Sequence, residues 1–247
     1  MKIKNKTRGL SMGRILANKK LSDDFYLIEV EEKNQVKAGQ FYMLRGWEEY
    51  PVLSRPISVF DADGDRISFL YKKVGKGTEL ISRLEPEKTL TLNGPYGNGF
   101  PMDIKGKIAM VGGGVGIAPF YYTAKKYKEA GISSQIDIYL GFSQKPVLEE
   151  EYRSVADNLY LDIGGFITDL VNPLEYDVIL TCGPEIMMKV LYEKCKKMDA
   201  GAPLYVSMEN RMACGIGMCK VCTCKTKNGN KTACKDGPVF LGSEVFA

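Results

Sequence analysis

The sequence contains no histidine and no long apolar run. Without an imidazole, histidine-containing zinc sites, catalytic triads and imidazole acid–base steps are excluded. Whatever chemistry the chain supports must therefore use a cofactor or other side chains.

The sequence also shows no pattern typical of a membrane span or a secretory signal. No stretch approaches the roughly 18 apolar residues that a transmembrane helix needs. The N-terminal MKIKNKTRGLSMGRIL is basic but has no apolar core behind its charges, so it does not resemble a secretory signal. We expect a soluble, cytoplasmic protein that does not bind membranes.

The excess of positive over negative charge is also small. Thirty-four lysines and arginines stand against 30 acidic residues, which gives a net charge of +4. Such a mild and evenly spread excess does not favour nucleic acid or an anionic surface as a partner. With 247 residues, 45% of them hydrophobic, the chain can bury a sizeable core.

The rhythm of apolar residues divides the chain into three regions. Residues 1–103 contain short alternating runs separated by Gly, Asp, Asn and Pro, a pattern typical of an antiparallel β-barrel. Residues 104–206 alternate strand, glycine loop and helix, which predicts an α/β domain with a parallel sheet. Residues 207–247 have little periodicity and most of the cysteines, so we expect a small irregular domain there.

Two motifs in the barrel region can contact phosphate. In LSRPISVF, Arg55 offers a guanidinium fork and Ser58 a hydroxyl, although for this stretch alone an ordinary arginine at a strand end beside a turn is the more frequent explanation. In VGKGTELIS, Gly75, Gly77 and Thr78 precede a helix that we expect to begin near Glu79. Backbone N–H groups at such a helix start favour a pyrophosphate, but a plain turn is the alternative.

Two further loops lie in the α/β region. GGGVGIAP, with glycines at 112, 113, 114 and 116, follows the predicted strand KIAMV but lacks the spacing of the dinucleotide fingerprint. Cys182, Gly183 and Pro184 follow a second predicted strand. Ligands of open α/β sheets bind at the carboxyl ends of strands, so the two loops are expected to flank one crevice. For Cys182 the alternative is an ordinary buried small residue.

The cysteines give the most specific signal. Cys214, Cys219 and Cys222 have the spacing C-x4-C-x2-C of plant-type 2Fe-2S ferredoxins, and Cys234 offers a fourth thiolate. A four-cysteine zinc site is the alternative, although zinc sites more usually show paired C-x2-C knuckles. We interpret Cys195 and Cys224 as spectators.

These motifs, in this order along nearly the whole chain, resemble the electron transfer subunits of NAD-dependent dihydroorotate dehydrogenase type B. The stretches that carry the resemblance are RPIS, the glycine–threonine loop, GGGVGIAP, CGP, ENRMACGIGMCKVC and CKDGPVF. The first two regions also resemble the wider ferredoxin reductase family. The resemblance implies an FAD-binding β-barrel, then an NAD(H)-binding α/β domain, then a 2Fe-2S cluster domain.

The resemblance also implies site residues, which we carry over as expectations. FAD would contact Arg55, Pro56, Ile57, Ser58, Leu70, Tyr71, Lys72, Gly77 and Thr78. NAD(H) would contact Gly112, Gly113, Gly114, Gly116, Cys182, Gly183 and Pro184. The cluster would be ligated by Cys214, Cys219, Cys222 and Cys234, and no residue would be catalytic.

The implied function is a relay. Nicotinamide exchanges a hydride, a cluster carries one electron at a time, and a flavin can do both. The implied partner is an FMN-containing catalytic subunit that oxidises dihydroorotate to orotate, assembled as a heterotetramer with two copies of each subunit. Two alternatives are the FAD/2Fe-2S subunit of another oxidoreductase, such as a ferredoxin-linked enzyme or a sulfide dehydrogenase, and a zinc-stapled interaction module.

Overall fold

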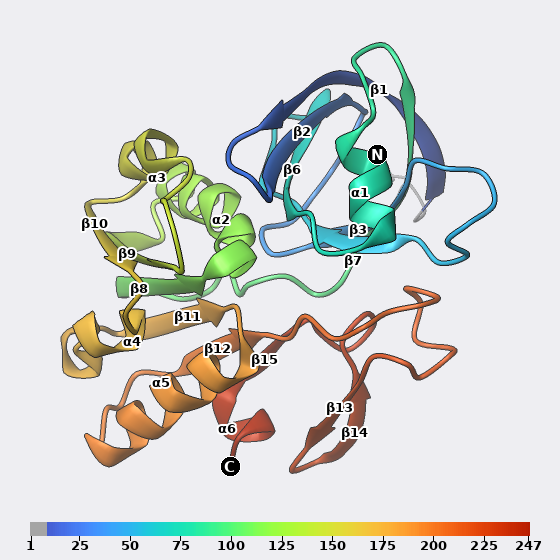
Figure 1. Cartoon of the computed structure of the whole chain (residues 1–247). Coiled ribbons are helices and arrows are strands. Elements are labelled where there is room, and N and C mark those ends of the chain that lie inside the picture. The colour runs from blue at the N-terminus through green and yellow to red at the C-terminus, as the bar shows by residue number, and fades with distance from the viewer. Residues whose placement is uncertain (1–8) are drawn as a thin grey trace, which may run out of the picture.

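A computed structural model describes residues 9–247 as two sheets and a small cysteine-rich segment (Figure 1). The interpretation of the basic N-terminus falls partly on residues 1–8, which lie outside the described residues. Within residues 9–247, no helix combines the length and apolar character needed to cross a bilayer.

The first sheet has seven strands in the order β4-β3-β7-β1-β2-β6-β5, and every neighbouring pair is antiparallel. Its strands are β1 (Gly9–Lys20), β2 (Phe25–Glu31), β3 (Phe41–Arg45), β4 (Arg55–Ser58), β5 (Asp61–Ala62), β6 (Arg66–Lys72) and β7 (Thr89–Tyr96). Alternate residues of β7 are buried, as expected when one face of a strand lines a core. The sheet curls around Ile15, Ile28 and Phe69, so the prediction of an antiparallel barrel is confirmed.

Helix α1 (Lys76–Ser82) begins earlier than the sequence predicts. The expected start near Glu79 is wrong because Thr78 closes the first turn. Its Oγ1 accepts hydrogen bonds from Val74 N at 3.0 Å and Gly75 N at 3.2 Å, and Glu79 N already donates to Gly75 O. Gly77 and Thr78 therefore lie inside the helix rather than before it.

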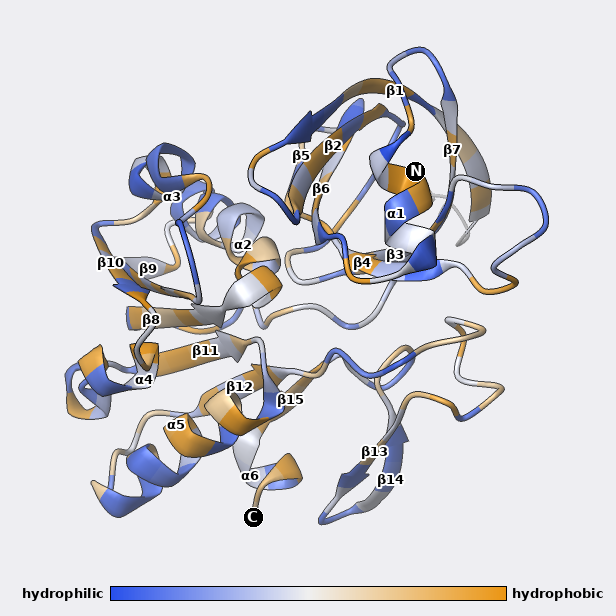
Figure 2. Ribbon diagram, viewed as in Figure 1, coloured by the Kyte–Doolittle hydropathy of each residue, from blue (hydrophilic) through white to orange (hydrophobic). Residues whose placement is uncertain are grey.

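The second sheet has six strands in the order β10-β9-β8-β11-β12-β15. Its strands are β8 (Gly106–Gly113), β9 (Ser133–Phe142), β10 (Asn158–Ile163), β11 (Val178–Cys182), β12 (Leu204–Ser207) and β15 (Val239–Leu241). The first five are parallel, as predicted, and β11 is buried along its whole length. Figure 2 shows this central strand as largely hydrophobic, which is typical of a parallel sheet covered on both faces.

Helices cover both faces of this sheet (Figure 1). The helical segments are η1 (Gly114–Ile117), α2 (Ala118–Glu129), α3 (Glu149–Val155), α4 (Ile167–Leu170), η2 (Pro173–Glu175), α5 (Glu185–Lys197) and α6 (Gly242–Val245). Helices α2 and α5 lie on opposite sides, and each follows a strand whose carboxyl end points toward the barrel. The glycine loop and the CGP turn thereby come to one edge.

The cysteine-rich segment includes a two-stranded ribbon, β13 (Thr223–Thr226) and β14 (Gly229–Thr232). The chain then returns as β15 and pairs antiparallel with β12, which the sequence analysis did not anticipate. The divisions at residues 103/104 and 206/207 stay predictions.

Candidate cofactor-binding site

A cavity of about 240 Å³ opens at the edge of the barrel, and we refer to it as the barrel-edge cavity. Its barrel wall consists of Phe41, Arg55, Pro56, Ile57, Ser58, Leu70, Tyr71, Lys72, Val74 and Thr78. Its opposite wall consists of Val115, Ala118, Ser207, Met208, Glu209, Asn210, Met212 and Pro238. Of the barrel residues that the resemblance assigns to FAD, all but Gly77 line this one space.

Arg55 is fixed by its neighbours. Its Nη1 donates to Leu53 O at 2.5 Å, and its guanidinium lies over the Trp47 ring at 5.4 Å from the centroid. Gly77 leaves room for it, since a Cβ there would lie 2.7 Å from Arg55 Cζ. Gly77 thus contributes by letting the guanidinium sit against the first turn of α1.

Tyr71 is fully buried, and its hydroxyl donates to Asn18 Oδ1 at 3.0 Å. Burial raises the pKa of this phenol well above its ordinary value, so the hydroxyl stays protonated. Tyr71 therefore holds β6 in place and leaves ionic contacts to its neighbour Lys72.

A second cavity, of about 410 Å³, lies at the carboxyl ends of β8 and β11, and we refer to it as the glycine cavity. Its walls include Gly113, Gly114, Gly116, Gly183 and Pro184, with Lys72, Val115, Glu185, Met188, Met208, Glu209 and Asn210. The two predicted loops therefore do flank one crevice.

The two loops touch backbone to backbone. A Cβ on Gly116 would clash with Gly183 Cα and would lie 2.5 Å from Cys182 O. Gly183 adopts φ +142°, a conformation that L side chains rarely take. Glycine at both positions is what allows the loops to meet.

Gly112 and Cys182 lie behind this crevice rather than in its wall. They are register partners on β8 and β11, and Cys182 is fully buried. The Cys182 Sγ lies 3.6 Å from Glu209 Oε1. Burial, reinforced by the charge of Glu209, raises the pKa of the Cys182 thiol well above its usual range, so this cysteine is a neutral thiol.

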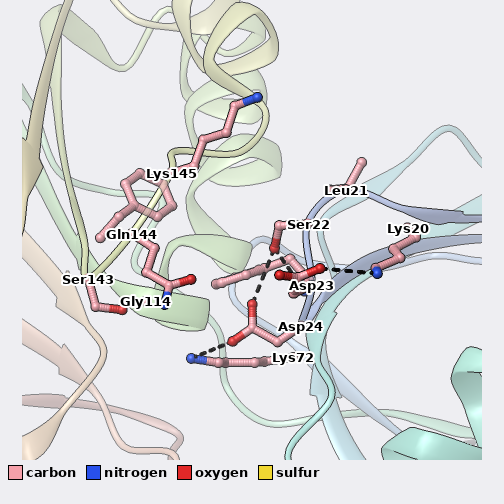
Figure 3. Close-up of a pocket in the computed structure, with 12 residues that line it drawn as sticks. Lys20, Leu21, Ser22, Asp23, Asp24, Lys72, Gly114, Ser143, Gln144 and Lys145 are labelled. Carbon is pink, nitrogen blue, oxygen red and sulfur yellow. Dashed lines mark hydrogen bonds and ion pairs between the residues drawn. The ribbon is translucent and has the colours of Figure 1, made fainter.

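A third cavity, of about 400 Å³, separates the start of β2 from the loop after β9, and we refer to it as the junction pocket (Figure 3). Lys72 and Gly114 line it as well as the glycine cavity. Figure 3 shows Lys72 paired with Asp24, at 2.9 Å between Nζ and Oδ2. Burial raises the pKa of the Asp24 carboxyl, but the hydrogen bond and charge of Lys72 outweigh it and lower the pKa overall.

The three cavities are continuous neighbours. The barrel-edge cavity and the glycine cavity share Lys72, Val115, Met208, Glu209 and Asn210. Ligands bound in these two cavities would therefore be separated by no more than the side chains that line both.

The cysteine segment brings its thiols together in pairs. Cys222 Sγ and Cys234 Sγ lie 3.2 Å apart and are buried, whereas Cys219 is exposed and its N–H donates to Cys214 Sγ at 3.4 Å. Gly217 N–H donates to Cys234 Sγ at 3.1 Å. Across residues 9–247, no group of three or more His, Cys, Asp or Glu side chains converges as metal ligands.

The thiols differ in acidity. The N–H of Cys219 lowers the pKa of the Cys214 thiol to about 6, so a thiolate forms readily there. Burial, followed by the hydrogen bond with Cys222, raises the pKa of Cys234 to about 12. Cys195 on α5 and Cys224 on β13 are also buried. In the part of the chain that the structure describes, neither thiol contacts a thiol of the two pairs.

The thiols and the barrel share a core. Phe41, Met43 and Tyr96 of the barrel pack in the same apolar cluster as Cys222 and Cys234. Phe41, Met208 and Met212 belong to this cluster and also line the barrel-edge cavity. The cysteine pair is thus joined to that cavity by packed side chains.

Several wall residues were missed from the sequence, namely Phe41, Met208, Glu209, Asn210, Met212 and Pro238. Glu209 follows the carboxyl end of β12, so the strand-end argument that selected Cys182 could have found it. Nothing in the local sequence marks Phe41 or Pro238.

Comparison with known proteins identifies the family. Residues 209–246 match the iron–sulfur cluster binding domain of dihydroorotate dehydrogenase B. The electron transfer subunit of dihydroorotate dehydrogenase B (NAD(+)) from Clostridium acetobutylicum is 46% identical over 241 residues, covering 94% of this chain and 96% of that protein. The chain belongs to this family. The corresponding subunit from Clostridium perfringens is 40% identical, with the same two coverages of 94% and 96%.

Solved structures agree on the fold. The NADH-dependent reduced ferredoxin-NADP oxidoreductase studied for flavin-based electron bifurcation includes a chain with 30% identity and a TM-score of 0.85, covering 97% of this chain and 91% of that one. A ferredoxin NADP+ reductase from Neisseria gonorrhoeae, solved with FAD and NADP, has 19% identity and a TM-score of 0.64, covering 84% and 96%, and supports the fold alone.

The expectations of family, fold class and electron transfer in an oxidoreductase complex are confirmed. The expected cofactor classes, a flavin, an iron–sulfur cluster and a nicotinamide nucleotide, agree with the same findings. The residue assignments stay predictions.

Proposed function

We propose that this chain relays electrons between NAD(H) and a catalytic partner subunit through FAD and a 2Fe-2S cluster. The observation that carries the proposal is the shared wall between the two cavities, together with the packed core that joins the barrel-edge cavity to Cys222 and Cys234. A two-electron donor, a flavin and a one-electron carrier can then lie in sequence.

FAD is assigned to the barrel-edge cavity. The apolar side chains of Ile57, Leu70 and Met212 suit a flat ring, while Arg55 and the start of α1 offer donors for a pyrophosphate. The cavity has room for the flavin ring only, so the rest of FAD would extend along α1.

NAD(H) is assigned to the glycine cavity and the junction pocket. Gly114 and Gly116 let a ligand approach the backbone, and no side chain from these glycines fills the crevice. Lys72 lines both spaces, so its ammonium would exchange Asp24 for a phosphate of the dinucleotide.

The cluster is assigned to Cys214, Cys219, Cys222 and Cys234. Four thiols, an acidic Cys214 and N–H groups directed at sulfur fit a 2Fe-2S cluster in donor type. When bound, the flavin exchanges a hydride with nicotinamide and single electrons with the cluster. The chain's own residues orient these groups and exclude water.

The partner is an FMN-containing subunit that oxidises dihydroorotate, and we propose a heterotetramer with two copies of each subunit in the cytoplasm. Dihydroorotate would lose two electrons and two protons there. The electrons would pass singly through this chain and reduce NAD+ to NADH, with one proton entering as part of the hydride and one released.

The test is the visible spectrum and the flavin, iron, sulfide and zinc content of protein purified without oxygen, alone and coexpressed with the dehydrogenase gene beside its own. We expect about one FAD and two irons per chain, and orotate-coupled NAD+ reduction in the complex. A colourless, zinc-loaded chain would overturn the relay and support the zinc-stapled alternative.

A second candidate is the corresponding subunit of a ferredoxin-linked nicotinamide oxidoreductase. It is favoured by the match to the ferredoxin-NADP oxidoreductase over 97% of this chain at 30% identity. The partner discriminates the two, because only the first candidate reduces NAD+ with dihydroorotate when the neighbouring subunit is present.

A further inference from the structure

The turn that follows β7 is hydrogen-bonded to the segment that follows Cys234. Asn98 N–H donates to Gly237 O at 2.7 Å. The Asn98 side chain uses both ends of its amide, since Nδ2 donates to Val239 O at 2.9 Å and Asp236 O at 3.2 Å while Oδ1 accepts from Val239 N at 3.2 Å. Four hydrogen bonds thus join one barrel residue to residues 236–239.

Gly97 packs closely against the same segment. It adopts φ +89°, and a Cβ there would clash with Pro238 Cδ and lie 3.2 Å from Gly237 O. The carbonyl of Gly97 accepts a hydrogen bond from Gln40 Nε2 at 2.8 Å, which ties the turn to the start of β3. We call Gly97 and Asn98, with residues 236–239, the clasp.

The clasped segment connects the parts of the proposed relay. Cys234 lies two residues before it, and Asp236 Oδ2 accepts hydrogen bonds from Thr232 N and Thr232 Oγ1 at 2.7 and 2.8 Å, which closes the turn around that cysteine. Pro238 lines the barrel-edge cavity, and its carbonyl accepts from Met208 N at 2.9 Å. The segment is therefore both a support for a cluster ligand and a wall of the flavin site.

We propose that Asn98 is a positioning residue for electron transfer, which fixes Cys234 relative to the barrel-edge cavity. The inference rests on the proposed function and adds to it the element that sets the separation of flavin and cluster. One-electron transfer slows steeply with separation, whereas hydride transfer from NADH depends on the glycine cavity, which the residues of the clasp do not line. Loosening the clasp should therefore affect one step and spare the other.

The chain offers matched variants. Asn98 is exposed, so Asn98→Ala removes side-chain hydrogen bonds without opening a cavity in the core. Gly97→Ala places a methyl group against Pro238. Gly99→Ala is the control, because Gly99 also has a positive φ, +75°, but its added Cβ would clash with Ala38 O inside the barrel and not with the clasped segment.

The experiment uses the flavin- and cluster-loaded chain, mixed with NADH in a stopped-flow instrument. NADH delivers two electrons and one proton as a hydride to the flavin, and the transfer of one of these electrons reduces one ferric iron. We expect wild-type rates of flavin reduction in Asn98→Ala and Gly99→Ala, but severalfold slower cluster reduction in Asn98→Ala. In Gly97→Ala the methyl group also presses on Pro238 in the cavity wall, so we expect a larger loss of cluster reduction there. Hydrogen exchange at residues 236–239 should rise in Asn98→Ala and rise further in Gly97→Ala. Gly99→Ala should keep the wild-type rate of cluster reduction and the wild-type hydrogen exchange.

The outcomes separate the two proposals. A wild-type chain without flavin and cluster would overturn the proposed function. A loaded chain in which Asn98→Ala reduces its cluster at the wild-type rate would overturn the clasp alone. Equal slowing in Gly99→Ala would also overturn it, since general strain in the barrel would then explain the effect.

Discussion

At the scale of single residues, the cysteines differ in exposure and in hydrogen-bond partners. Cys214 and Cys219 lie near the surface, Cys222 and Cys234 form a buried pair, and Cys224 is buried but hydrogen-bonded to Asn210. A bare count of cysteines would not separate these cases, because acidity and access decide which thiol binds metal.

Cys219→Ser should therefore remove the cluster and leave the flavin in place. Cys219 is exposed and contributes nothing to the wall of the barrel-edge cavity, so the fold should survive. We expect iron and sulfide content to fall to near zero and transfer to the partner to be abolished. Cys224→Ser is the control and should keep its iron. Orotate-coupled NAD+ reduction by Cys219→Ser would contradict the ligand assignment.

Glu209 gives a prediction on pH. Glu209 is exposed at the surface as a whole residue, but loss of hydration around its carboxyl beside the buried Cys182 raises the pKa of that carboxyl above the ordinary 4.5, and the hydrogen bond with Cys182 offsets this only in part. The folded chain therefore holds this proton to a higher pH than the unfolded chain does. Its contribution to stability is complete below pH 4.5 and is lost as pH rises through the raised pKa.

In Glu209→Gln that loss should disappear. The unfolding midpoint of the variant, measured relative to wild type, should increase from about pH 4.5 upward and then level off above the raised pKa. Glu193→Gln, an exposed change on α5, should show no such trend. A difference between Glu209→Gln and wild type that is independent of pH would mean that the carboxyl has no raised pKa.

At the scale of elements, the meeting of η1 with the turn before α5 shapes the glycine cavity. Both segments follow adjacent parallel strands, β8 and β11, whose carboxyl ends share one edge. Their closest approach, at Gly116 and Gly183, leaves no space for a side chain.

Gly116→Ala should force these segments apart. Overpacking of this kind costs about 1–3 kcal/mol of stability, and the displaced loop should bind NADH more weakly while the flavin stays bound. Titration with NADH and thermal unfolding would measure the two effects. Gly201→Ala, where an added Cβ meets nothing within 4 Å, should match wild type in both. Unchanged NADH affinity in a stable Gly116→Ala chain would remove this loop from the nucleotide site.

At the scale of the whole molecule, the cysteine segment connects the two sheets. It begins at the end of β12, packs through Met212 and Cys222 against barrel residues, and returns to β12 as β15. A cluster bound there would close the loop between its ligands and so add to the stability of this segment.

Removal of the iron should therefore loosen one part of the molecule and not the rest. After chelation under oxidising conditions, we expect hydrogen exchange to rise across residues 214–222 while β8 and β11 remain protected and flavin stays bound. Wild-type protection of residues 214–222 in the iron-free chain would show that the cluster does not order this loop.

The sequence by itself determined the kinds of group in the site. The absence of histidine, the C-x4-C-x2-C spacing and the glycines after apolar strands are local features, and each follows from residue type and short spacing. Parallel strands place their carboxyl ends at one edge, which is why the crevice between Gly116 and Gly183 could be predicted.

Only the tertiary structure decided what faces these groups. Met212, Glu209 and Pro238 reach the barrel-edge cavity, and Asn98 reaches Val239 across 141 residues of sequence, through packing that no local pattern encodes. The start of α1, by contrast, is set by hydrogen bonds of Thr78 within its own turn, which is local chemistry that the sequence analysis missed. Short-range chemistry is written in residue order, whereas the distances between cofactor sites depend on how the barrel, the parallel sheet and the cysteine segment pack together.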